Sequence, residues 1–411
     1  MNNQENRIQQ VAEANDAKTS ANFVIEREIA YAELVEDIRA WDAQAQHRTG
    51  TDGDRITSEV LMRRLANSDV HVEIVEFPFS RRVPKHCYVQ TRAQRIEGIP
   101  LFDGGETQAE ISGFVVNAGD EGEFAVGFAS AVGSPANHAL FSYRDSSTYR
   151  ALIGISRNET AGIAMLNADA YLTPHGLPIL IVDGRYESFL QEAIRARQPI
   201  NLNVAFDIEQ TIATNVQATV VGTNPKLKPV VVMTPKSSWW TSTAERCGGI
   251  AAWLAVVRAV AASPPTRTVI FTANTGHELG HVGLDHFLEQ NPDLAQGAHV
   301  WVHLGANFAA KDSQVRIQYS NETLGERLRQ HLHSHQVEIA GEVPSSTRPG
   351  GEARNIFDAG GNYVSLLGSN GLFHHPDDRM ANNVDMNRAM RSRNAVVSLV
   401  KDLSGDDGNA P

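Results

Sequence analysis

The C-terminal half of the sequence alternates short apolar runs with segments of helical periodicity. Residues 229–233, 268–273 and 299–304 are rich in β-branched and aromatic side chains, which is typical of buried strands. Between them, apolar residues recur at helical spacing over 248–262 and 279–290. Strands that alternate with helices in this way form a mostly parallel sheet covered by helices. We therefore predict an α/β fold with a mostly parallel, twisted sheet flanked by helices.

The length and a change of pattern in the middle of the chain predict two structural units. A chain of 411 residues is longer than one ordinary domain. From about residue 85 to 215, short β-like runs are interrupted by Gly, with one helix near 186–196. We predict that 1–84 form an N-terminal helical part of the catalytic domain, 85–215 an inserted, mostly β domain, and 216–411 the catalytic α/β domain.

Composition and charge limit the class of partner. The formal net charge is −12 and the isoelectric point lies near 5.7, which argues against nucleic acid or an anionic membrane as a partner. Cys87 and Cys247 are the only cysteines, too few for a disulfide framework or a thiolate zinc site. Residues 1–7 lack an apolar core of signal-peptide length, so we expect a cytoplasmic protein. We expect a small-molecule or short peptide substrate, and a homo-oligomer is compatible with the sequence.

Three ionisable residues follow the apolar run 268–273, where open α/β sheets place their ligands. The segment His277-Glu278-Leu279-Gly280-His281 has two interpretations. In the first, it is a metalloprotease helix motif with two His ligands one turn apart and a Glu base. Gly280 within the turn and the lack of a third ligand at the expected spacing weigh against it. In the second, Glu278 binds a metal at the strand end, His277 is an acid or base, and His281 is a packing residue.

Polar residues also follow the other predicted strands. The connector 234–249 carries Lys236, Ser237, Glu245 and Arg246, which either line a site or form a polar loop that caps the next helix. His303 ends the run 299–304 and belongs either to a site or to the core. His374, followed by His375, Pro376, Asp377 and Asp378, is typical of a metal ligand that is fixed by a second carboxylate, with a capped turn as the alternative.

Together these segments resemble the zinc aminopeptidases with co-catalytic metals, whose fold also serves the glutaminyl cyclases. Residues 278–283 match the second Glu and the glycines of the family's Glu-Glu-x-Gly-x-x-Gly motif, and 374–378 match its late His-x-Pro-x-Asp motif. Residues 245–249 fall on Asp-Asn-x-Ser-Gly, with the final Gly kept. The ordered match extends over roughly 215–400, and the insert at 85–215 resembles a protease-associated domain. The resemblance implies the fold of this family and a hydrolase.

The sequence departs from the family's pattern at several ligand positions. Pro235 and Ser237 stand where the first His and Asp ligands belong, and His277 replaces the general-base Glu. The late-strand Asp has no clear counterpart. Three ligand positions of the family keep a residue that can bind metal, namely Glu245, Glu278 and His374. These correspond to the trio that holds the single zinc in the glutaminyl cyclases.

We therefore predict an aminopeptidase-like hydrolase acting on an amide, peptide or related C–N bond of a small substrate. It would use at most one divalent metal, zinc by resemblance, held by Glu245, Glu278 and His374. His277 would transfer protons, because histidine exchanges protons near neutral pH. Lys236 or Arg246 would bind a substrate carboxylate or stabilise an oxyanion.

Two alternatives stay open. One is a metal-independent hydrolase or lyase in which Ser237 is the nucleophile and Lys236 or His277 is the base. The other is a non-catalytic homologue that binds a ligand, since lost ligands often accompany lost activity.

Overall fold

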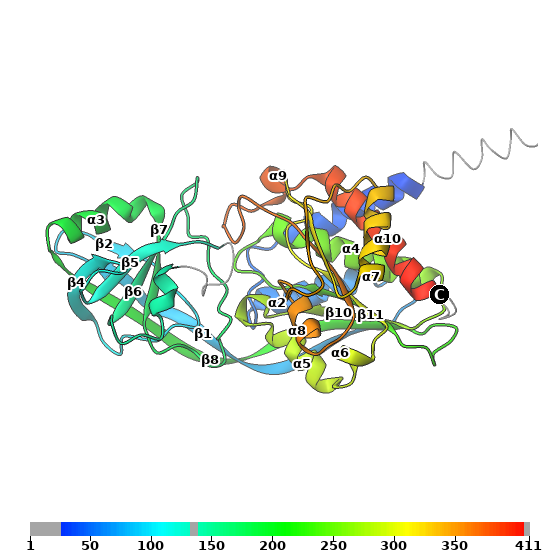
Figure 1. Cartoon of the computed structure of the whole chain (residues 1–411), viewed down its shortest axis with the longest axis horizontal. Coiled ribbons are helices and arrows are strands. Elements are labelled where there is room, and N and C mark those ends of the chain that lie inside the picture. The colour runs from blue at the N-terminus through cyan, green and yellow to red at the C-terminus, as the bar shows by residue number, and fades with distance from the viewer. Residues whose placement is uncertain (1–25, 132–138, 407–411) are drawn as a thin grey trace, which may run out of the picture.

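The computed structural model describes residues 26–131 and 139–406 of the chain. Figure 1 shows two lobes joined by two long antiparallel strands, β1 (Val72–Gln90) and β8 (Pro199–Val220). The boundaries predicted at 84/85 and 215/216 fall inside these two strands. Both strands contribute to both lobes, and the division into domains stays a prediction.

The larger lobe contains the predicted mostly parallel sheet. Its strand order is β13-β12-β14-β11-β9-β10-β8. The strands are β9 (Val230–Pro235), β10 (Val269–Asn274), β11 (Val300–Leu304), β12 (Arg316–Tyr319), β13 (Gly341–Val343) and β14 (Tyr363–Leu367). β10, β9, β11 and β14 are parallel, while β8 and β12 run antiparallel to their neighbours at the two sides of this group. The predicted runs 229–233, 268–273 and 299–304 are thus strands of one sheet, and the predicted fold class is confirmed.

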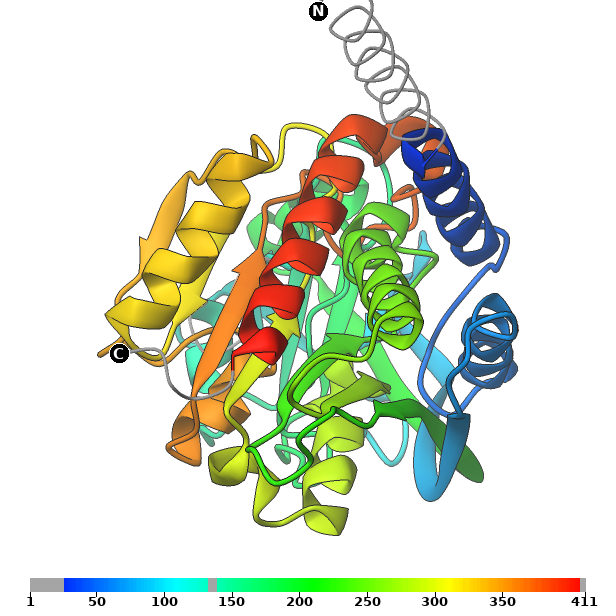
Figure 2. The same cartoon turned by 90° about the vertical axis from the view of Figure 1, so that its right-hand side faces the viewer.

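Helices cover both faces of this sheet (Figure 2). The helices of the larger lobe are α2 (Asp52–Arg64), α4 (Thr243–Ala262), α5 (Val282–Gln290), α6 (Leu294–Gly297), α7 (Glu322–Ser334), α8 (Ala353–Asp358), α9 (Met380–Asn383) and α10 (Met386–Gly405). In β9, Val230 and Val232 pack in one core with α4, α7 and α10, whereas Val231 and Met233 pack in another with α5, α6 and α8. This alternation follows from the two-residue period of a strand. None of the described helices combines the length and hydropathy needed to span a bilayer.

The smaller lobe is built mainly from short strands. They are β2 (Arg95–Glu97), β3 (Ile99–Pro100), β4 (Ile111–Asn117), β5 (Phe124–Ala129), β6 (Ala151–Ser156) and β7 (Ile179–Asp183). β4, β5, β6 and β7 are parallel, and α3 (Glu187–Arg195) lies where a helix near 186–196 is predicted. Its own apolar core includes Ile153, Leu180 and Val182, all fully buried or nearly so.

Candidate functional site

The segment after β10 is not a continuous helix. His277–Leu279 form a single 3₁₀ turn, η4, and α5 begins only at Val282. Gly276 before this turn and Gly280 and His281 after it all have positive φ, which breaks helical geometry. A side chain at Gly280 would place its Cβ 2.5 Å from the Asp169 carbonyl oxygen, so only glycine fits there. The segment therefore does not form the continuous helix that the metalloprotease interpretation requires, while metal binding by the two histidines stays a prediction.

A buried guanidinium lies between two carboxylates at the strand ends. Arg246 Nη2 is 2.9 Å from Glu278 Oε1 and 2.8 Å from Glu245 Oε1. The Arg246 Nε donates to the Ser237 carbonyl at 2.7 Å, and the Ser237 hydroxyl donates to Glu278 Oε2 at 2.7 Å. All four side chains are buried. Burial lowers the pKa of Arg246, but Glu245 and Glu278 outweigh it and raise the pKa above its usual value.

His374 lies beside Glu245. Its Nδ1 bonds the Met165 carbonyl at 2.7 Å, which turns Nε2 toward Glu245 Oε1 at 3.3 Å. Burial raises the pKa of Glu245, but Arg246 and His374 bring it down to about 2. A carbonyl rather than a carboxylate thus orients His374, contrary to the sequence-based expectation.

Asp378 instead binds the start of α4. Its two carboxylate oxygens accept from the backbone N–H groups of Ala244 and Glu245, each at 3.0 Å. Burial, reinforced by the charge of Glu245, raises the pKa of Asp378 to about 6. The carboxylates of Glu245 and Asp378, which both lie at the start of α4, therefore have pKa values shifted in opposite directions from their usual values.

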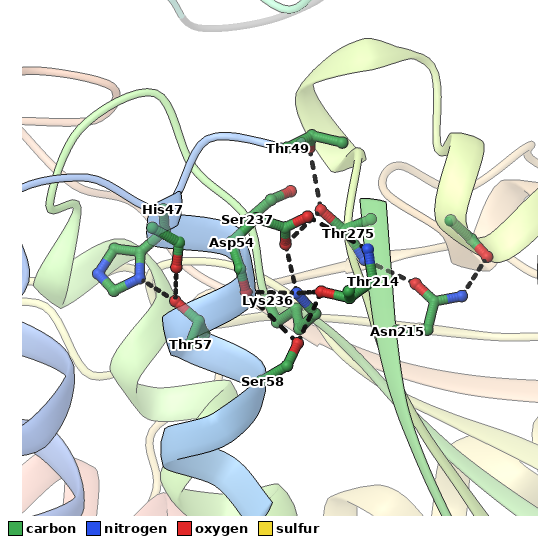
Figure 3. Close-up of polar contacts among 12 residues, drawn as sticks. His47, Thr49, Asp54, Thr57, Ser58, Thr214, Asn215, Lys236, Ser237 and Thr275 are labelled. Carbon is green, nitrogen blue, oxygen red and sulfur yellow. Dashed lines mark hydrogen bonds and ion pairs between the residues drawn. The ribbon is translucent and has the colours of Figure 1, made fainter. Parts of the chain in front are cut away.

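Lys236 is enclosed in a separate polar network (Figure 3). Its ammonium forms an ion pair with Asp54 of α2 and lies 3.3 Å from Thr214 Oγ1 of β8. The same carboxylate accepts from Thr275 Oγ1 at 2.8 Å. Burial lowers the pKa of Lys236, and Asp54 offsets part of this effect. Lys236 is fully buried and neutralised by Asp54, so direct contact with a substrate would require the network to open.

Glu352 is a central residue that sequence reasoning missed. Its Oε1 lies 2.8 Å from His277 Nδ1, and its Oε2 lies 2.9 Å from His303 Nε2. His303 Nδ1 in turn contacts Ser365 Oγ at 2.8 Å. Burial raises the pKa of Glu352, but the nearby histidines, His277 first, bring it well below its usual value. The only sequence signal is the pair Gly350-Gly351, and a Cβ at Gly351 would lie 2.7 Å from His303 Cε1.

His281 lies against His277. The ring centroids are 5.2 Å apart with an interplanar angle of 21°, and His281 Nδ1 contacts Asn355 Oδ1 at 2.7 Å. Burial lowers the pKa of His281 to about 3, so it is neutral at physiological pH. Ligand atoms of His277, His281 and Glu352 all lie within 4.8 Å of one another. No other set of His, Cys, Asp and Glu in the described ranges does so.

The predicted metal ligands Glu245, Glu278 and His374 do not bring their ligand atoms this close together. Glu245 and His374 are in contact, but Glu278 is connected to them through the Arg246 guanidinium. Both Glu278 oxygens are engaged by Arg246 and Ser237. As the side chains lie, Glu245, Glu278 and His374 do not converge on a metal ion, and Arg246 supplies the positive charge between the carboxylates. The metal role of these three residues stays a prediction.

Comparisons with known proteins give the fold. No protein-family model and no curated protein sequence matches the chain. A zinc aminopeptidase from Bacillus subtilis matches 94% of this chain and 96% of its own, with a TM-score of 0.71 and 13% identity. The chain has the zinc-aminopeptidase fold.

Two further structures agree. A peptidase M28 precursor from Shewanella amazonensis matches 93% of this chain and 97% of its own, with a TM-score of 0.69 and 14% identity. An aminopeptidase from Aneurinibacillus sp. matches 90% and 93%, with a TM-score of 0.64 and 12% identity. The resemblance found in the sequence motifs is thereby confirmed for the fold. In this zinc-aminopeptidase fold, Glu278, Arg246 and His277 lie at the carboxyl ends of the central strands.

Proposed function

We propose that this chain hydrolyses an amide or peptide bond in a small-molecule or short peptide substrate, with His277 as the group that transfers protons. The similar structures are described as peptidases, which supports the reaction class. The observation that carries the proposal is the contact of 2.8 Å between His277 Nδ1 and the buried Glu352 carboxylate. We also retain the expectation of a cytoplasmic protein.

The Glu352 contact prepares His277 for proton transfer. A carboxylate at Nδ1 favours the tautomer in which Nδ1 carries the proton and donates it to Glu352. Nε2 then holds a free lone pair that accepts a proton from an attacking water. Glu352 is itself fixed by His303 on its other oxygen, so the imidazole has one defined orientation. Glu352 thus acts as a positioning residue for His277.

Arg246 supplies the positive charge at the strand ends. It neutralises Glu245 and Glu278, the two carboxylates that would otherwise need a metal ion there. A fixed guanidinium in a dry site also stabilises negative charge that develops on a carbonyl oxygen. This arrangement supports at most one divalent metal per chain.

A second candidate places one metal ion elsewhere. His277, His281 and Glu352 offer two imidazoles and one carboxylate, a donor set that suits zinc in catalytic sites. The Nδ1 atom of His281 is oriented by Asn355, as is usual for a metal ligand. An ion bound there would supply a Lewis acid and an acidified water. His277 would then be a ligand and could not carry the proton.

The geometry gives less support to a Ser237 nucleophile. Its side chain is fully buried, and its hydroxyl donates to Glu278 rather than to Lys236 or the His277 ring. An acyl group would have to reach Oγ through the protein interior.

The test is an assay of purified protein against a panel of aminoacyl amides and short peptides, with and without added zinc. We expect hydrolysis, and His277→Ala should lower kcat by about 10²–10⁴. His333→Ala, at an exposed position on α7, is the matched control and should leave kcat unchanged.

His281→Leu separates the two candidates, because it is nearly neutral if His277 carries protons and inactivating if both histidines bind a metal. Full activity of His277→Ala would refute both, and no hydrolysis on any substrate would favour a binding protein.

A further inference from the structure

One narrow pocket opens directly beside Glu278, where the two lobes meet. Side chains from the segment after His47, from β1, from the smaller lobe, from the β9–α4 connector and from η4 line it. The lining residues that bear charge are Arg48, Arg81, Arg82 and Glu278. Three guanidinium groups and one carboxylate therefore face a single small space.

The positive charges in this pocket exceed the negative ones. Glu278 is already neutralised by Arg246. Among the residues that the structure describes, Arg81 is the only one of the three arginines that forms an ion pair, with Glu209 at 2.5 Å. Arg82 donates to the Phe102 and Gly104 carbonyls at 2.8 and 3.0 Å, contacts that fix its position without cancelling its charge.

In the described part of the chain, the direct contacts of the Arg48 guanidinium are with aromatic rings. The guanidinium lies 4.7 Å from the centroid of Phe102 and 5.5 Å from that of Trp239, two rings that stack on each other at 4.9 Å. Within residues 26–131 and 139–406, no carboxylate forms an ion pair with Arg48, and no hydrogen bond involves its side chain. Aromatic faces attract a cation but leave its N–H groups without acceptors. The Arg48 donors are thus available to a ligand.

Partial burial of like charges without counter-ions opposes folding. Burial and the adjacent Arg81 lower the pKa of Arg48 to about 10, although Tyr171 and Glu278 act in the opposite direction, and the side chain stays charged at neutral pH. Such an arrangement is stabilised when an anion enters and makes charge-assisted hydrogen bonds. The paired donors of a guanidinium match a carboxylate or a phosphate, and of these two anions a peptide or amide substrate supplies the carboxylate.

We propose that Arg48, assisted by Arg82, binds a carboxylate of the substrate, and that this protein therefore acts on acidic peptides or amides. The inference rests on the proposed function for its catalytic part, since Glu278 is shared between the pocket and the strand-end site. The carboxylate comes either from an Asp or Glu side chain or from a free C-terminus.

The first test measures binding and does not depend on turnover. Titration by calorimetry would compare N-acetylglutamate with its neutral counterpart N-acetylglutamine amide. It would include N-acetylglutamine, which retains the main-chain carboxylate, and N-acetylglutamate α-amide, which retains the side-chain carboxylate. We expect the dianion to bind at least tenfold more tightly than the neutral compound. The single-carboxylate compounds identify which source the pocket accepts. Equal binding of charged and neutral compounds would overturn the proposal.

Variants assign the effect to Arg48. Arg48→Met should abolish the tenfold preference, and Arg48→Lys should retain part of it, because lysine keeps the charge but lacks the fork of donors. Arg195→Met on α3, where the side chain is 70% exposed, is the control and should bind like the parent. An unchanged preference in Arg48→Met would also overturn the proposal. If Arg48→Met does not fold, Arg48→Lys and the parent's own preference decide the matter.

Turnover gives a separate readout. If the parent hydrolyses peptides, its kcat/KM should be at least tenfold higher for acidic than for neutral substrates, and Arg48→Met should remove this difference mainly through KM. Selective binding of carboxylates without any turnover would support the pocket and refute the hydrolase. Turnover without a preference for acidic substrates would support the hydrolase and refute the carboxylate-binding pocket.

Discussion

Basic side chains on two sides of Glu278 differ in whether a carboxylate neutralises them. On the strand-end side, Lys236 faces Asp54, and Arg246 faces both Glu245 and Glu278. On the pocket side, Arg48 and Arg82 share the pocket with Glu278, but neither forms an ion pair with a carboxylate in the described part of the chain. Lys236 and Arg246 are fully buried, whereas Arg48 and Arg82 are half-buried, so the two groups differ in depth as well as in charge pairing. A buried cation with a fixed partner stabilises the fold, whereas one without a partner is available to bind a ligand.

The position of the paired cations is informative. In the resemblance to the zinc aminopeptidases, Pro235 and Ser237 replace two metal ligands, and Glu245 and Glu278 retain two others. Arg246 contacts both retained carboxylates, and Lys236 lies between the two replaced positions. We infer that side-chain cations have taken over the electrostatic role of metal ions here. The following predictions test this contrast between paired and unpaired cations.

The largest effect should follow the loss of Arg246. Arg246→Met leaves Glu245 and Glu278 buried without a counter-charge, and removing one partner of a buried ion pair costs about 3–5 kcal/mol. We expect the free energy of unfolding, measured by urea denaturation, to fall by this amount. Adding Glu278→Gln should restore part of it, because one uncompensated carboxylate is removed. A loss below about 1 kcal/mol would show that Arg246 is not the required counter-charge.

Lys236→Met should destabilise the protein somewhat less, by about 3 kcal/mol, because Asp54 keeps donors from Thr275 Oγ1 and the Gly50 backbone N–H. The double variant Lys236→Met/Asp54→Asn should recover part of the loss. Lys226→Met, at an exposed position, is the matched control and should change stability by less than about 0.5 kcal/mol. If the single variant were as stable as the parent but failed to bind substrate, Lys236 would be a substrate-binding residue as the sequence suggests.

A smaller effect should appear in the pH dependence of stability. The pKa of Asp378 is raised to about 6 in the folded state from its usual 3.8. Between these pH values the folded state retains a proton that the unfolded state releases, so stability falls as pH rises through this window. The fall should be at most about 3 kcal/mol. Glu245 behaves oppositely: its pKa of about 2 gives stability that is lost only as pH falls below about 4.5.

The measurement is urea denaturation of the parent and of Asp378→Asn from pH 4 to 7. The fall between about pH 4 and 6 should be present in the parent and absent in the variant. The amide of the Asp378→Asn variant cannot accept from both backbone N–H groups, so the variant is expected to be less stable at every pH. The slope of the free energy of unfolding with pH is therefore compared, and not its absolute value. Identical slopes in the two proteins would contradict the raised pKa of Asp378.

Sequence patterns predicted the sheet well and the site only in part. Strand runs such as 229–233 are local features, and the order of helices and strands then limits the topology. The sequence also placed Arg246, Glu278 and His277 near one another, because carboxyl ends of parallel strands share one edge. It could not show the direction of the Arg246 side chain, and this direction decides whether the carboxylates are free for a metal.

Other features depend on contacts between distant segments. Glu352 reaches His277 across 75 positions through a loop whose only sign is a pair of glycines. Arg48, in the segment before α2, and Arg82, on β1, are both far from Glu278 in the sequence and line the same pocket only in the folded chain. The partners of a charged side chain are therefore the part of the site that a single sequence conveys least.

The number of zinc ions bound per chain tests the central claim most directly. Purified protein would be saturated with zinc, desalted and measured by elemental analysis, in parallel with His281→Leu and Glu245→Gln. Because Arg246 and Lys236 occupy the strand-end positions, we predict no more than one tightly bound ion per chain. Any bound ion should be lost in His281→Leu and retained in Glu245→Gln. Two ions per chain, or one that Glu245→Gln removes and His281→Leu leaves in place, would contradict the replacement of metal by side-chain cations.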